Sequence, residues 1–268
     1  VHTINMEDNI REYLESLEKI KISIVMQVYL GDYPTARFDA LGRFRRAIKS
    51  FENQIYKNCE LIIVADGCNK TQQIYNREFK SNPNIRFVYL DRDRQEEPAT
   101  YETIEYSEQH FNVWRGEARA FGVTAASGSV ITYMDSDDYL TPQFTQNLLL
   151  MYNASKDKQW WLNKSWYENQ ASSFNAEDGY KTDMASQPTI KFDYLPSLWK
   201  EAIIEKSTDM PWLFAHKADC TSVKWRDTFG RVNEHADFVQ RFIEKYNKGA
   251  VYEKATYVRC HCAEKWDI

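Results

Sequence analysis

Runs of apolar residues alternate with helical periodicities along the first half of the chain. Four mainly apolar runs predict strands, over residues 22–29, 60–65, 85–90 and 129–134. Runs rich in β-branched and aliphatic residues are typical of strands covered on both faces, so the first, second and fourth of these strands are expected to be buried. The segments between them predict helices, over residues 39–54, 71–80 and 113–127. Strands that alternate with helices predict an α/β fold with a mostly parallel central sheet and helices on both of its faces.

The second half of the chain is less regular and rich in tryptophan. Its pattern predicts a strand over residues 160–167 and helices from Thr141-Pro142 to about 155, over 197–206 and over 234–247. Apolar residues at helical spacing predict a further short helix within residues 1–20. We therefore expect one domain over residues 1–268, made of an N-terminal helical segment (1–21), a regular α/β half (22–140) and a less regular half (141–268).

Composition and charge exclude several classes of protein. The net charge of −5 shows no basic surplus of the kind that proteins on nucleic-acid backbones carry, so we expect no nucleic-acid partner. No run approaches the roughly 18 apolar residues of a transmembrane helix, although peripheral association with a membrane stays open. The acidic residues of segment 1–20 argue against a signal peptide. Five cysteines without a staple pattern predict reduced thiols and a cytoplasmic protein. The oligomeric state stays open.

Three aspartates follow the strand predicted over residues 129–134. In open α/β sheets, ligands bind beyond the carboxyl ends of the strands, where Asp135, Asp137 and Asp138 are placed. Carboxylates that lie close together repel one another unless a cation or hydrogen-bond donors neutralise them. Mg²⁺ and Mn²⁺ bind carboxylate and phosphate oxygens, so the cluster predicts a metal site. The alternative is a solvated turn in which Asp138 caps a helix that starts at Tyr139.

Residues 119–138, RAFGVTAASGSVITYMDSDD, resemble a stretch of the family 2 glycosyltransferases. In that family an A-R-N-x-G-I helix leads through A-x-G into a strand that ends in D-x-D-D. Residues 22–32 resemble the family's first strand and its V-Y-N-x loop, and residues 62–68 resemble its second strand and D-D-G-S turn. The chain departs from this pattern at Gln27, Leu30, Ala65 and Ala120, which stand where Pro, Asn, Asp and Asn are common.

The resemblance implies a GT-A fold that binds a nucleotide-diphosphate sugar through residues 22–140. It places Gln27, Tyr29 and Asp66 around the base, where Asp66 could accept the imide N–H of a uracil and so select a UDP-sugar. Arg115 or Arg119 would neutralise phosphate charge, or they could be ordinary residues of an exposed helix face.

The resemblance also implies the ligands of a Mn²⁺ or Mg²⁺ ion. Asp135 would face the ribose or the metal, and Asp137 would bind the metal at the pyrophosphate. Residues 257–261, YVRCH, resemble the family's Y-R-x-H segment, in which His261 could be a third metal ligand or a phosphate donor. His261 could equally be a structural residue.

In the second half, residues 232–242, VNEHADFVQRF, resemble the family's E-D-x-D-x-x-x-R segment at the start of a late helix. Glu234, Asp237 and Arg241 match its spacing, and His235 stands in the place of the catalytic Asp. Histidine can act as a general base near neutral pH, while Glu234 or Asp237 could serve instead.

Two features of the sequence leave their roles open. The polar, aperiodic residues 91–112 predict a mobile segment near the nucleotide. Any of six tryptophans could form a platform for a sugar or an acceptor, and the sequence does not choose among them: Trp160, Trp161, Trp166, Trp199, Trp212 and Trp225.

The resemblance implies a metal-dependent inverting glycosyltransferase of the hexosyl or N-acetylhexosaminyl type. Its partners would be a nucleotide-sugar donor, most favourably a UDP-sugar, and the hydroxyl of a saccharide or glycoconjugate, as in polysaccharide biosynthesis. The departures at Ala65, Ala120 and His235 keep open a noncatalytic nucleotide-sugar-binding protein. A sugar nucleotidyltransferase is less favoured, because residues 30–37, LGDYPTAR, lack the Gly-rich, basic loop that would hold a triphosphate.

Overall fold

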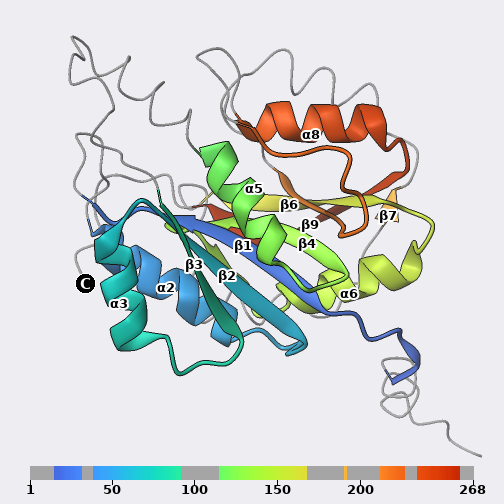
Figure 1. Cartoon of the computed structure of the whole chain (residues 1–268). Coiled ribbons are helices and arrows are strands. Elements are labelled where there is room, and N and C mark those ends of the chain that lie inside the picture. The colour runs from blue at the N-terminus through green and yellow to red at the C-terminus, as the bar shows by residue number, and fades with distance from the viewer. Residues whose placement is uncertain are drawn as a thin grey trace, which may run out of the picture.

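The computed structural model describes residues 15–31, 39–91, 115–167, 190–191, 212–226 and 234–259. Within these ranges the strands form one nine-stranded sheet in the order β3-β2-β1-β4-β8-β6-β9-β5, and β7 pairs with β9 (Figure 1). The strands are β1 (Ile22–Val28), β2 (Cys59–Asp66), β3 (Ile85–Leu90), β4 (Val130–Asp135), β5 (Tyr139–Leu140), β6 (Trp160–Tyr167), β7 (Ile190–Lys191), β8 (Trp212–Lys217) and β9 (Gly249–Arg259). The helices are α2 (Ala40–Glu52), α3 (Asn69–Glu78), α5 (Arg115–Ala125), α6 (Phe144–Ala154) and α8 (Glu234–Lys245).

The four strands predicted from apolar runs lie side by side and parallel. β1 is flanked by β2 and β4, and β3 extends the sheet beyond β2. This order confirms the mostly parallel sheet. The chain moves outward from β1 through β2 to β3 and then returns across the sheet to β4, so the strand order reverses between β1 and β4.

Helices cover both faces of this sheet, and the side chains of β1 alternate between them. Ile22, Ile24 and Met26 belong to one apolar cluster with residues of α2, α3 and α6, while Val25 belongs to a second cluster with residues of α5 and α8. Figure 1 shows α5 lying across one face of the parallel strands. Successive side chains of a strand point to opposite faces of the sheet, so β1 carries mainly apolar residues on both of its sides.

The close approach of α5 to the sheet requires a glycine. A Cβ at Gly122 would lie 2.4 Å from Cγ1 of Val25 and 2.8 Å from Cγ2 of Val64, inside van der Waals contact. Gly122 therefore lets the helix backbone lie directly on β1 and β2. This contact sets the position of the other α5 side chains, including Arg119, relative to the strand ends.

The second half adds antiparallel strands that the apolar pattern does not reveal. β8 pairs antiparallel with both β4 and β6, and β6 pairs parallel with β9. The alternative role of Asp138 as a helix cap is wrong, because Tyr139–Leu140 forms β5 and α6 begins at Phe144 with Gln143 as its N-cap. The helix predicted over residues 234–247 is confirmed as α8, whereas that over 197–206 and most of segment 1–20 lie outside the described residues. Among the helices of the described ranges, none has both the length and the apolar character that a membrane span requires.

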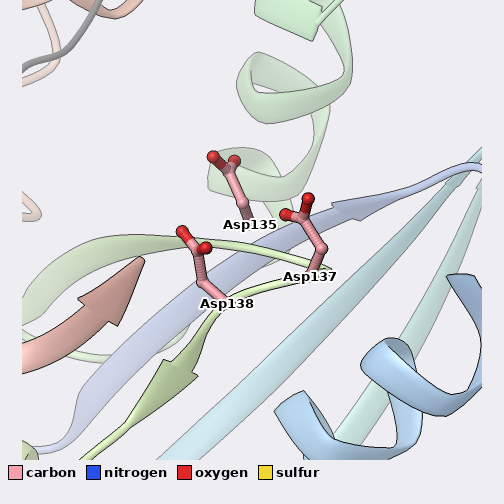
Figure 2. A group of neighbouring side chains, drawn as sticks. All are labelled: Asp135, Asp137 and Asp138. Carbon is pink, nitrogen blue, oxygen red and sulfur yellow. The ribbon is translucent and has the colours of Figure 1, made fainter. Parts of the chain in front are cut away.

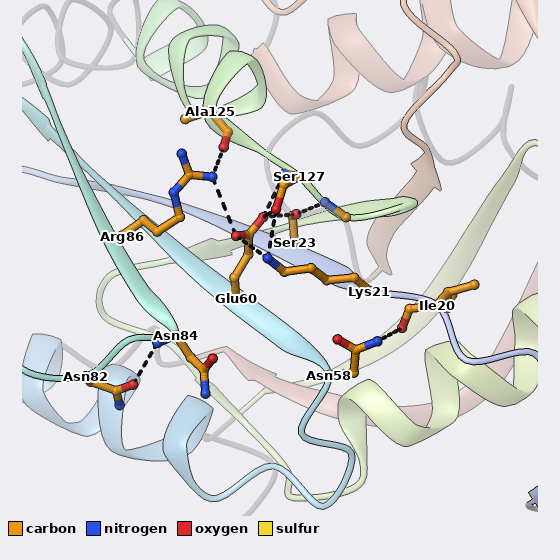
Figure 3. A network of polar contacts seen from close by, with 11 residues as sticks. Ile20, Lys21, Ser23, Asn58, Glu60, Asn82, Asn84, Arg86, Ala125 and Ser127 are labelled. Atoms are coloured by element: carbon orange, nitrogen blue, oxygen red, sulfur yellow. Dashed lines mark hydrogen bonds and ion pairs between the residues drawn. The ribbon is translucent and has the colours of Figure 1, made fainter.

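A buried carboxylate joins the amino ends of the parallel strands, opposite the edge that carries the aspartates (Figure 3). Glu60 is 2% exposed and accepts hydrogen bonds from Lys21 Nζ at 2.8 Å and Ser23 Oγ at 2.6 Å. It also accepts from the backbone N–H of Ser127 at 2.7 Å. Burial alone would raise the pKa of Glu60, but these donors outweigh burial and hold the pKa at about 2. One ionised side chain thus ties β1 and β2 to the turn between α5 and β4.

We expect Glu60→Gln to lower the free energy of unfolding by about 2–3 kcal/mol at pH 7, because the folded state binds the ionised carboxylate through charge-assisted hydrogen bonds. The folded pKa lies below the unfolded value of 4.5, so this stabilisation is complete above pH 4.5 and is lost as the pH falls toward 2. Urea unfolding of both proteins between pH 7 and pH 3 measures it. A stability difference that does not narrow below pH 4.5 would contradict the assignment.

Candidate active site

The strand order reverses between β1 and β4, so the carboxyl ends of these two strands form a topological switch point. In open α/β sheets, ligands bind at this kind of topological switch point. Gln27 on β1 is paired with Asp135 on β4 and with Val64 on β2, so these residues lie side by side across the sheet. The first of the predicted metal ligands is therefore at the switch point.

The three aspartates converge on one small volume just beyond β4 (Figure 2). Carboxylate oxygens of Asp135, Asp137 and Asp138 all lie within 4.8 Å of one another. Asp135 and Asp137 are half-buried and Asp138 is 4% exposed. Hard oxygen ligands gathered in this way fit Mg²⁺ or Mn²⁺. Asp138 thus lies beside Asp135 and Asp137, the two residues that the family pattern implies as metal ligands.

Helix α2 supports the chain that follows the aspartates. The side chain of Arg46 donates to the carbonyl oxygen of Asp137 at 3.0 Å. One turn further along the helix, Ser50 Oγ accepts from the N–H of Leu140 at 3.0 Å. Gln54, just after the end of α2, donates through Nε2 to the carbonyl of Thr141 at 2.8 Å. These contacts hold the main chain on both sides of Asp138 and so limit how far the carboxylates can separate.

The residues expected around the base lie at the ends of the neighbouring strands. Gln27 and Tyr29 are half-buried at the end of β1. Asp66 ends β2 and is 3% exposed, and Gly67 follows it with a φ of 61°, which a residue with a Cβ rarely adopts. Arg115 begins α5, but its side chain, like His261 and residues 92–112, lies outside the described part of the chain.

Arg119 lies behind the aspartates, in the interior. Its side chain is 1% exposed and donates through Nη2 to Oδ1 of Asp135 at 2.8 Å. Nη1 of the same guanidinium donates to Oε1 of Glu234 at 2.7 Å. The side chain therefore joins β4 to α8, and its burial favours an internal ion pair over a contact with solvent or an exposed helix face.

The first turn of α8 carries the three residues considered for the general base. Glu234 is 2% exposed and bound to Arg119, whereas the side chain of His235 is 27% exposed, with Nε2 at 4.0 Å from Oε1 of Glu234. Burial tends to raise the pKa of Asp237, but hydrogen bonds from Arg226 and Arg241 outweigh burial and lower this pKa. Of the three, His235 has the most accessible side chain.

An aromatic cluster lies beneath this turn. The guanidinium of Arg119 is 4.9 Å above the ring of Trp225, which is stacked on Phe238 with centroids 4.1 Å apart. The ring of His235 contacts the same tryptophan edge-on at 5.1 Å. Trp225 is 5% exposed, so it supports Arg119 and His235 from within. Trp160 and Trp161 are also buried, which leaves both in the core and away from a sugar-binding surface.

A buried hydrogen bond between β4 and β8 completes the cluster. His216 Nδ1 lies 2.8 Å from the carbonyl of Lys217, which can only accept, so Nδ1 carries the proton. His216 Nε2 then accepts from the hydroxyl of Tyr133 at 2.7 Å. Burial lowers the pKa of His216 to about 4. The sequence alone reveals neither this pair nor the contacts of Arg46 and Gln54, because their partners lie far away along the chain.

The sheet order and the switch point define an α/β fold of the GT-A type, with the carboxylate cluster at the ends of its strands. The solved structure of TarS residues 1–349 from S. aureus is similar over 90% of this chain and 60% of its own, with a TM-score of 0.61 and 13% identity. TarS has also been solved with UDP-GlcNAc. The mannosyltransferase PcManGT from Pyrobaculum calidifontis, solved with GDP-Man and Mn²⁺, is similar over 90% of this chain and 57% of its own, with a TM-score of 0.54 and 10% identity.

Residues 38–158 match the family described as Glycosyl transferase family 2. Glycosyltransferase GlyA of Streptococcus pneumoniae is 24% identical over 128 residues, which make up 48% of this chain and 14% of GlyA. The chain thus resembles the family 2 glycosyltransferases over residues 38–158 and has a fold of the GT-A type, as the motifs predicted. It spans less than two thirds of the length of each of these proteins.

We expect the buried His216 to make stability depend on pH. Its pKa of about 4 in the folded protein lies below the ordinary 6.5, so its neutral form stabilises the fold fully above pH 6.5 and this contribution is lost as the pH falls toward 4. The free energy of unfolding should fall by about 1–2 kcal/mol between pH 7 and pH 5. His216→Gln keeps an acceptor for Tyr133 and should lack this slope in urea titrations; an equal slope in both proteins would contradict the assignment.

Proposed function

We propose that this protein is a metal-dependent, inverting glycosyltransferase that moves a sugar from a UDP-sugar to the hydroxyl of a saccharide or glycoconjugate. The observation that carries the proposal is the convergence of Asp135, Asp137 and Asp138 at the switch point of a GT-A sheet. In the proposed complex, Asp135 and Asp137 hold Mn²⁺ or Mg²⁺ with Asp138 beside them, and His261 completes the set. The bound cation would neutralise charge on the departing diphosphate.

The uridine preference rests on Asp66. A carboxylate accepts hydrogen bonds, and the imide N–H of uracil is a donor that cytosine does not offer at the same position. Gln27 and Tyr29 lie at the end of the adjacent strand, where they would complete the base site. TarS was solved with UDP-GlcNAc and PcManGT with GDP-Man, so similarity of fold alone does not select the base. A hexosyl or N-acetylhexosaminyl donor fits the proposal.

His235 is the proposed base. It would take the proton of the acceptor hydroxyl as that oxygen forms a bond to the anomeric carbon, while the bond from this carbon to the phosphate oxygen breaks on the opposite face. The nucleoside diphosphate leaves with the electron pair of this bond. Because the new bond forms on the face opposite the leaving group, the configuration at the anomeric carbon inverts. The exposure of His235 supports this role, because a general base must be within reach of the acceptor hydroxyl.

Further parts of the proposal concern the rest of the chain. Residues 22–140 would bind the nucleotide sugar, with Arg115 near the phosphates, and residues 141–268 would bind the acceptor. A cytoplasmic location, with the donor supplied from the cytosol, stays a prediction from the sequence.

We expect the protein to bind UDP more tightly than GDP or CDP and to need a divalent cation to do so. Asp137→Asn should weaken Mn²⁺-dependent UDP binding at least tenfold, because it removes one of the gathered charges. Asp157→Asn changes an exposed aspartate that pairs with Lys158 at 3.4 Å, and it serves as the matched control. Calorimetry with each nucleotide, with and without Mn²⁺, measures these differences. UDP binding by Asp137→Asn at the wild-type level would overturn the metal site, and a preference for GDP or CDP would overturn the role of Asp66.

We expect His235→Ala to lower the turnover by about 10²-fold or more and to leave nucleotide affinity nearly unchanged, since a positioned base contributes on this scale. Initial rates of sugar transfer, measured as release of nucleoside diphosphate with and without acceptor, test the expectation. Near-wild-type turnover in His235→Ala together with loss of transfer in Asp237→Asn would assign the base to the carboxylate. Binding of nucleotide sugars without any turnover in the wild type would favour a noncatalytic binding protein.

A further inference from the structure

A buried arginine next to a cation site presents an electrostatic conflict. The guanidinium of Arg119 stays charged at every accessible pH and lies 2.8 Å from Oδ1 of Asp135, one of the gathered carboxylates. A positive charge in this place repels a divalent cation and competes for a ligand oxygen. The side chain is 1% exposed, so water does little to screen it.

Glu234 lies where it can resolve this conflict. Its Oε1 accepts from Nη1 of Arg119 at 2.7 Å, on the other arm of the guanidinium from Asp135. Glu234 is 2% exposed, so its charge acts at short range and through little solvent. One guanidinium and two carboxylates leave the triad with a net charge of −1, whereas Arg119 and Asp135 without Glu234 would be neutral.

The surroundings keep Glu234 and Arg119 in this arrangement. Trp225 lies under the guanidinium at 4.9 Å and is stacked on Phe238 of α8 at 4.1 Å. His235, the next residue of α8, contacts the same ring. Because α8 is anchored through these rings, Glu234 cannot withdraw from Arg119 without moving the helix.

We propose that Glu234 is a positioning residue that compensates the charge of Arg119. The negative charge of Asp135 then stays available to the divalent cation, while Arg119 holds α8 against β4. This inference rests on the proposed metal site and deepens it. It separates the roles of two adjacent residues: Glu234 supports the cation site through Arg119, and His235 faces the acceptor.

The test measures the affinity of the full chain for Mn²⁺ alone, from the spin-resonance signal of free Mn²⁺. We expect Glu234→Gln to weaken Mn²⁺ binding about tenfold or more, because the uncompensated guanidinium then acts on Asp135. Glu244→Gln is the matched control: it makes the same change on the same helix, at an exposed residue that accepts a hydrogen bond from Gln240. Its Mn²⁺ affinity should equal that of the wild type.

The double variant Arg119→Met/Glu234→Gln separates charge compensation from a merely structural role. It removes both charges, so its Mn²⁺ affinity should return to within about threefold of the wild type. Equal weakness of the double variant and Glu234→Gln would overturn the inference, as would wild-type affinity in Glu234→Gln. If Glu234→Gln does not fold by circular dichroism, the double variant decides alone: affinity near that of the wild type supports the inference, and tenfold weaker binding overturns it.

Asp137→Asn tells the two proposals apart. If this variant binds Mn²⁺ as tightly as the wild type, the metal site itself is wrong and the role of Glu234 fails with it. If Asp137→Asn loses Mn²⁺ while Glu234→Gln keeps it, the metal site stands and only the compensation by Glu234 is rejected.

Discussion

The arrangement of the site depends on one buried guanidinium. A charged group without solvent must be paired, and Arg119 is paired on two sides by carboxylates from β4 and α8. These partners lie 16 and 115 residues away along the chain, so the ion pairs join its two halves. Trp225 and Phe238 fill the space beneath the guanidinium and limit rearrangement. The position of His235 relative to the aspartates follows from this contact.

Polar networks fix the parallel strands at both of their ends and so give the site a rigid base. At the amino ends of the strands, Glu60 is surrounded by donors from three segments. At the carboxyl ends, Ser50 of α2 and Gln54, just after this helix, bind the main chain that follows the aspartates. A buried polar group stabilises only an arrangement of the chain that supplies its hydrogen-bond partners. The two networks therefore favour one register of strands and loops, and functional groups on such elements keep their geometry.

Much of the first half could be predicted because its signals are local. Apolar runs in β1, β2 and β4 reflect burial on both faces, whereas β3 lies at the end of the sheet and is only partly buried. The aspartates after β4 fall at the carboxyl ends of the strands, where such sheets bind ligands. β8 and β9 were not expected, since these strands pair with partners far away in the sequence and their mixed side chains show no single period. For the same reason the sequence could not tell that Trp160 and Trp161 belong to the core.

The sequence by itself determined the α/β class, the resemblance to the family 2 glycosyltransferases and the carboxylate cluster, because each depends on neighbouring residues and on the period of burial. Only the tertiary structure decided that Glu234 is bound to Arg119, that Asp237 is held by two arginines and that His235 is the more exposed of the three. All three occupy one turn of α8, where spacing alone treats them alike. Their environments differ because each faces a different element of the folded chain, and the partner that a side chain meets across the fold sets its charge and its accessibility.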